Sequence, residues 1–115
     1  GRRAALDARQ QAGDGGDSNS PLAQYVAAIK NKVRNNWLRP ETVQNVRCVV
    51  RIVQLPGGTV MTASIVPPCY ADEATRRSME AAVMRSDPLP YRGFEAVFAR
   101  NIDLEFCYPE TLCQN

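Results

Sequence analysis

The sequence predicts an α+β fold, in which a three-stranded antiparallel sheet carries helices on one face. Apolar residues recur every three or four positions in the segments 20–39 and 72–86, as expected for amphipathic helices. They alternate with other residues in the segments 46–55, 59–66 and 102–108, as expected for strands with one buried face. The order helix, strand, strand, helix, strand therefore favours one sheet whose helices pack on a single apolar face.

The first helix has a defined start and a basic face. Ser20 supplies a hydroxyl acceptor at the N-cap, and Pro21 has the fixed backbone angle that suits a first helical turn. The apolar stripe consists of Leu22, Tyr25, Val26, Ile29, Val33 and Trp37. The remaining surface carries Lys30, Lys32 and Arg34. We interpret these three as a solvated face, with an anionic-ligand site as the alternative.

A β-hairpin is expected next. The first strand, VRCVVRIVQL, turns one face toward the core with Val46, Cys48, Val50 and Ile52. The connection LPGGT supplies a proline and two glycines for a tight turn. In the returning strand, the residues expected to share a face are Met61, Ala63 and Ile65.

The second helix is capped by Asp72 and has a modest apolar stripe. Its members are Ala74, Met79, Ala82 and Val83. Prolines at 88 and 90 end the helix, and the stretch GFEAVFAR that follows is expected to be helical or irregular. It contributes three side chains to the core, those of Phe94, Val97 and Phe98.

The last strand, Ile102 to Tyr108, separates apolar from acidic side chains. One side carries Ile102, Leu104, Phe106 and Tyr108, and the other carries Asp103, Glu105 and Cys107. If this strand lies beside the first one, its acids meet Arg47 and Arg51. Such cross-strand pairs contribute about 0.2–1 kcal/mol each, so they would help to set the register.

The four cysteines form an even set without the two-residue spacing of a zinc knuckle or a redox motif. Two disulfides in an oxidising compartment fit this small chain best, with four reduced thiols as the alternative. Cys48 points to the core face and Cys107 to the outer face, so a bridge between them opposes the pleat. Among the three possible pairings, the sequence favours Cys48 with Cys69 and Cys107 with Cys113.

Composition argues against catalysis. The chain has no histidine, the commonest general base and a common metal ligand. It also lacks a phosphate-binding loop, a dinucleotide fingerprint and a nucleophile elbow. Asp103 and Glu105 have the spacing of a carboxylate pair for sugar hydrolysis, but neighbouring arginines would keep both ionised. We therefore predict that the protein is not an enzyme and has no cofactor and no metal site.

Binding is the remaining class of function. The net charge of +2 gives no strong field toward nucleic acid, and the outer sheet face has no surplus aromatics for stacking RNA bases. An open three-stranded sheet has two edges, and a partner peptide can add a strand to either one through main-chain hydrogen bonds. An edge that merely stays solvated is the alternative.

Two segments of different character are expected. Residues 1–19 change from helix formers to Gly, Asp, Ser and Asn, which predicts the tail of a preceding helical region, here called the stalk, and a flexible linker, with a disordered cloning remnant as the alternative. Residues 20–115 would form the domain. No signal peptide or membrane-spanning stretch is visible, so we expect an excised fragment whose export or anchoring segment lies upstream.

Four stretches resemble a known family when they are taken in order. They are QYVAAIKNKVRNNW, VRCVVRIVQLPGGTV, DEATRRSMEAAV and FEAVFARNIDLEF, and the similarity runs from Leu22 to about Pro109. Together they look like the TolA branch of the TonB/TolA C-terminal family. The TonB branch has the same architecture, but its Tyr-Pro entry motif and Gly-rich lead into the first strand are not visible. In the family, the first-strand cysteine pairs with one on the second helix; this helix has none, and Cys69 just before it would take that place.

The resemblance implies a non-enzymatic, periplasmic interaction domain of an inner-membrane-anchored protein. Its partners would be TolB and Pal, with TolQ and TolR at the membrane anchor, in support of outer-membrane integrity and cell division. Group A colicins and a filamentous phage minor coat protein would use the same domain. The TonB alternative implies contacts with outer-membrane transporters. Partner strands would add to the edge of the last strand, at Ile102, Asp103, Leu104, Glu105 and Phe106.

Overall fold

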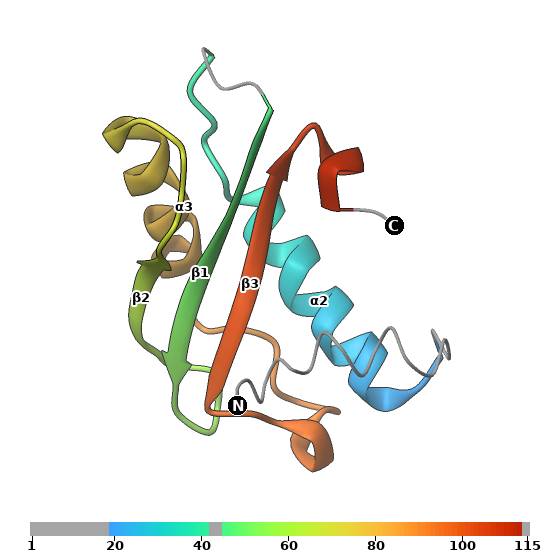
Figure 1. Cartoon of the computed structure of the whole chain (residues 1–115). Helices are drawn as coiled ribbons and strands as arrows, with labels where there is room; N and C mark the ends of the chain where they lie inside the picture. Colours follow the sequence, from blue (N-terminus) through green and yellow to red (C-terminus); the bar gives the residue numbers. More distant parts are fainter. Residues whose placement is uncertain (1–18, 42–44, 114–115) are drawn as a thin grey trace.

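The fold is an antiparallel sheet with two helices on one face, as the sequence predicted (Figure 1). The computed structural model describes residues 19–41 and 45–113, so the expected stalk and most of the linker lie outside the described residues. The elements in chain order are α2 (Pro21–Asn35), β1 (Val46–Gln54), β2 (Val60–Val66), α3 (Glu73–Arg85), the 3-10 helix η1 (Glu95–Val97), β3 (Asn101–Tyr108) and the 3-10 helix η2 (Glu110–Cys113). The strand order is β2-β1-β3, which gives the sheet two edge strands.

Both long helices begin at the predicted caps. The hydroxyl of Ser20 accepts a hydrogen bond from the N–H of Ala23 at 3.1 Å, and Pro21 occupies the first turn of α2. Asp72 caps α3 by accepting from the N–H of Thr75 at 2.8 Å. Hydrogen bonding to Thr75 lowers the pKa of the Asp72 carboxyl, because it favours the ionised form. Within the described residues, neither helix is long and apolar enough to cross a membrane.

The core lies between the helices and one face of the sheet. Its completely buried members include Tyr25, Ile29, Val33, Val50, Ile52, Met79, Ala82 and Val83. The opposite face of β1 is open, with Arg47 and Arg51 exposed. Because only one face is covered, the alternation seen in the sequence is preserved in the burial of β1.

Two predicted core positions were wrong. Met61 is 51% exposed and Val60 is buried in its place, because the β1–β2 register shifts by one residue between Val53 and Gln54. Such a β-bulge reverses which side chains face the core beyond it. In α3, Ala74 is exposed and Thr75 is buried, because Thr75 continues the three- and four-residue spacing of the other buried residues of α3.

The hairpin turn is fastened to the segment after α3. The N–H of Leu89 donates to the carbonyl of Gly58 at 2.8 Å. Gly58 has a φ of +93°, and a Cβ at this position would clash with the backbone of Leu89. Gly57 has a similar φ of +99° but faces open space. The second glycine of the turn is therefore required for close approach as well as for its backbone angle.

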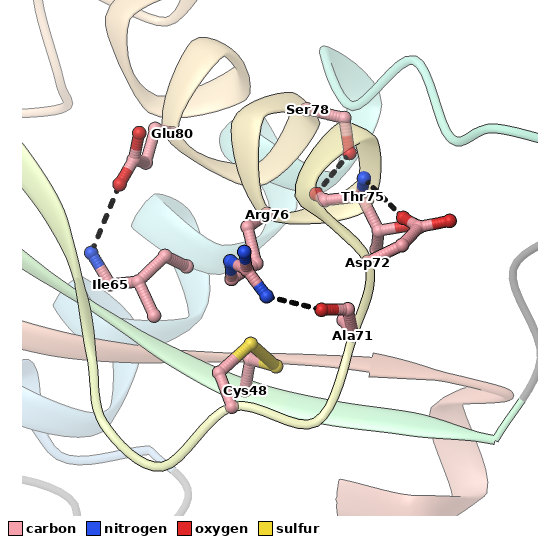
Figure 2. Close-up of a disulfide and its surroundings, with 9 residues drawn as sticks. Cys48, Ile65, Ala71, Asp72, Thr75, Arg76, Ser78 and Glu80 are labelled. Atoms are coloured by element: carbon pink, nitrogen blue, oxygen red, sulfur yellow. Dashed lines mark hydrogen bonds between the residues drawn. A yellow bond between two sulfur atoms is a disulfide. The ribbon is translucent and has the colours of Figure 1, made fainter.

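The cysteines form the two pairs that the sequence favoured. Cys48 on β1 is bonded to Cys69 in the β2–α3 connection, with the two Cα atoms 5.1 Å apart. Figure 2 shows this bridge below the start of α3, close to the hydrogen bond from Arg76 to the carbonyl of Ala71. Cys107 is bonded to Cys113, with a Cα separation of 5.8 Å, and this second bridge folds η2 back against β3. The two disulfides thus tie down the β2–α3 connection and the C-terminal turn.

Candidate functional site: the free edge of the sheet

The outer side of β3 presents backbone groups to which a further strand can bind. The N–H of Gln54 donates to the carbonyl of Arg100 at 2.9 Å. In an antiparallel pair, hydrogen-bonded and non-hydrogen-bonded positions alternate, so Ile102, Leu104 and Phe106 also face β1. The N–H and C=O groups that point away from the sheet are those of Asn101, Asp103, Glu105 and Cys107. In the described part of the chain, no strand pairs with that side of β3.

The acids of β3 are held by arginines of β1, as predicted from the alternation. Arg51 donates to both carboxylate oxygens of Asp103, at 2.9 and 3.0 Å. Arg47 donates to Glu105 at 3.0 Å. The hydrogen bond and the negative charge of Asp103 raise the pKa of the Arg51 guanidinium. Both carboxylates are thus engaged in cross-strand ion pairs, which fits a structural role in setting the register of the sheet.

Along the other edge of the sheet, β2, two outward amides are bonded to carboxylates. The N–H of Ile65 donates to Glu80 of α3 at 3.1 Å, and the N–H of Val60 donates to Asp87 at 3.1 Å. Figure 2 shows Glu80 reaching from α3 to the backbone of Ile65. Both residues lie opposite β1 at non-hydrogen-bonded positions of the ladder, so their N–H groups point outward and are ones that a docking strand would need. Sequence reasoning missed this protection.

A cleft of about 130 Å³ runs beside β3 on the helix-covered side of the sheet. Its walls come from α2 and the segment just after it, from β3 and from η2. The lining residues are Lys30, Val33, Arg34, Trp37, Leu104, Glu105, Phe106, Cys107, Glu110 and Cys113. An ion pair between Arg34 and Glu110 joins the α2 wall to η2. The second disulfide and this ion pair hold η2 at the C-terminal end of β3, so the part of the edge away from η2 is Asn101 to Glu105.

The structure divides the predicted edge residues into two groups. Ile102, Leu104 and Phe106 have buried side chains that belong to the core. The side chains of Asp103 and Glu105 lie on the outer face of the sheet. Their backbone N–H and C=O groups point away from β1, toward the free side of the strand. The cleft residues Lys30 and Trp37 were not among the predicted site residues, although both are on the predicted helix pattern. Only the fold brings them beside β3.

Comparison with known proteins gives the family. A family model described as TonB C terminal matches residues 22–106. The chain belongs to the TonB C-terminal family. This confirms the predicted family, and the match covers both helices and nearly all of the sheet. None of the curated proteins matches the chain significantly.

One solved structure places this member of the TonB C-terminal family close to TolA. The solution NMR structure of TolAIII bound to a peptide derived from the N-terminus of TolB shares 27% sequence identity with this chain. The match covers 71% of this chain and 70% of that one, with a TM-score of 0.59. The chain is therefore a TolA/TonB C-terminal domain, with the α+β fold of a family that includes a peptide-bound member.

Proposed function

We propose that this domain is a non-enzymatic interaction module of the Tol-Pal system, and that it captures an extended segment of TolB as a fourth strand on the free edge of β3. The observation that supports the proposal is the difference between the edges: the outward N–H and C=O groups of β3 have no neighbouring strand in the described chain, while two outward N–H groups of β2, those of Val60 and Ile65, are bonded to carboxylates. The similar TolAIII structure, with its bound TolB peptide, supports the choice of partner.

The proposal extends to the setting of the domain. It would act in the periplasm as the C-terminal domain of an inner-membrane-anchored protein, with residues 1–19 as the end of a helical stalk and a linker. TolQ and TolR would contact the anchor, and TolB and Pal would link the domain to outer-membrane integrity and cell division. A filamentous phage minor coat protein and group A colicins would use the same β3 edge.

The direct test is an NMR titration of the isotope-labelled chain with a synthetic peptide from the N-terminus of TolB of the same bacterium. The expected result is saturable amide shifts, together with new protection from hydrogen exchange at the outward amides of Asp103 and Glu105. The amides of Ile65 and Val60 on the other edge serve as the internal control and should change little. Shifts centred on β2, or no shifts at all, would contradict the proposal.

A TonB-type function is the second candidate, because the matching family model is described as TonB C terminal. It predicts binding to a peptide from an outer-membrane transporter in place of the TolB peptide. The same titration with a transporter peptide separates the two functions. Selective binding of the TolB peptide favours the Tol-Pal function, and selective binding of the transporter peptide favours the TonB function.

A further inference from the structure

A strand added to β3 would place half of its side chains over the cleft. Side chains of a β-strand alternate between the two faces of the sheet, so every second residue of the new strand lies on the helix-covered face. On that face its neighbours are Leu104 and Phe106 of β3 and the wall formed by α2. The cleft is thus the space that the inward side chains of a docked strand must enter.

The wall near the C-terminal end of α2 is apolar and rigid. The rings of Trp37 and Phe106 meet edge to face with their centroids 5.2 Å apart. The indole N–H of Trp37 donates to the hydroxyl of Ser78 at 2.8 Å, which fixes the orientation of the ring. Val33 and Leu104 are buried beside them. A cavity of about 150 Å³ accepts a benzene-sized molecule, so a cleft of this volume suits one apolar side chain.

Lys30 leaves the cleft with one positive charge that is not paired within the described chain. Arg34 is paired with Glu110, and Glu105 is paired with Arg47. Lys32 donates to the carbonyl of Pro88 at 2.6 Å. Lys30 is exposed and makes no hydrogen bond or ion pair with the other residues that the structure describes, yet it lines the cleft. A carboxylate on the docked strand is the group that would complete this charge pattern.

We propose that the cleft is the specificity pocket of the β3 edge. It takes one apolar side chain of the docked strand against Trp37, and Lys30 pairs with an acidic side chain two residues away on the same face of that strand. This inference rests on the proposed function, because it assumes a strand on β3. Main-chain bonds alone accept almost any extended sequence, whereas this pocket selects an acidic and an apolar residue at alternate positions.

The test compares Lys30→Glu with Lys32→Glu, a matched change on the same helix whose side chain does not line the cleft. Affinity for the TolB N-terminal peptide is measured by calorimetry on the full chain, after heteronuclear NMR spectra show that both variants are folded. Lys30→Glu should weaken binding about tenfold, and Lys32→Glu less than about twofold. Peptides in which single acidic residues are replaced by lysine identify the pairing position. One of them should bind Lys30→Glu more tightly than it binds the unsubstituted domain.

A second measurement examines the apolar anchor. Nuclear Overhauser contacts from one apolar peptide residue to the Trp37 ring and to the Val33 methyl groups are expected. If the β3 amides respond to the peptide but these contacts are missing and the two lysine variants behave alike, the pocket is overturned while edge capture stands. If the β3 amides do not respond, edge capture itself fails and the pocket with it. Trp37 contacts that grow with protein concentration without peptide would identify a second copy as the occupant and overturn the inference.

Discussion

Along β2, the outward N–H groups of Ile65 and Val60 donate hydrogen bonds to Glu80 and Asp87. Along β3, the outward N–H groups of Asp103 and Glu105 have no strand beside them in the described chain. Carboxylates of the helix and turn that follow β2 occupy these two amides, which disfavours pairing with other chains at this edge. The β3 edge is limited at one end by η2 and open elsewhere. The difference teaches that side chains around a single small sheet can occupy one edge while the other is left uncovered.

The largest loss of stability on the β2 side should come from changing the turn that joins β2 to the segment after α3. Gly58→Ala is expected to destabilise the domain by about 2–4 kcal/mol, because a Cβ collides with the backbone of Leu89 at a positive φ. Gly57→Ala meets open space and should cost about 1–2 kcal/mol from its backbone angle alone. Urea unfolding of both variants measures the difference. Equal losses would show that close contact with Leu89 does not hold the turn.

The hydrogen bond from the Ile65 amide to Glu80 can be removed more selectively. Glu80→Ala leaves the half-buried N–H of Ile65 without its acceptor, which should cost about 1–2 kcal/mol and speed hydrogen exchange at that amide. Glu73→Ala on the same helix loses an exposed pair with Arg77 and an acidic side chain in the first turn, and should cost about 0.5–1 kcal/mol without affecting the Ile65 amide. If Ile65 exchanges at the same rate in both variants, Glu80 does not protect this edge.

Acid should loosen the start of α3, by a smaller amount. The pKa of Asp72 is lower in the folded domain, so its contribution to stability is fully present above the ordinary carboxyl pKa, near 4, and is lost as the pH falls through the depressed value. Asp72→Asn keeps a capping oxygen but removes this titration. Unfolding measured from pH 6 to pH 2 should therefore show a weaker acid dependence in the variant. An unchanged acid dependence would exclude Asp72 as its source.

Much of the fold could be predicted because each strand has one covered face, so burial follows the two-residue alternation in the sequence. The same alternation placed Asp103 and Glu105 opposite the arginines of β1. It did not reveal that Val60 replaces Met61, because a bulge depends on how two strands pair and not on the residues of one strand. It also did not reveal Glu80 or Lys30, since their roles arise from the distance between a helix and a strand edge.

A partner strand is expected to add to β3 and not to β2. The most direct measurement is calorimetric titration of the TolB N-terminal peptide into two folded proline variants, one for each edge. Glu105→Pro removes an outward N–H of β3, and Ala63→Pro removes the outward N–H at the matching position of β2, while a proline on an edge leaves the ladder to β1 in place. Glu105→Ala controls for the loss of the pair with Arg47.

We expect Glu105→Pro to reduce affinity about thirtyfold or more, with Ala63→Pro and Glu105→Ala within about threefold of the unsubstituted domain. Heteronuclear NMR spectra of each variant establish that it is folded before binding is compared. Tight binding by folded Glu105→Pro, or a selective loss in Ala63→Pro, would contradict the assignment of β3 as the docking edge.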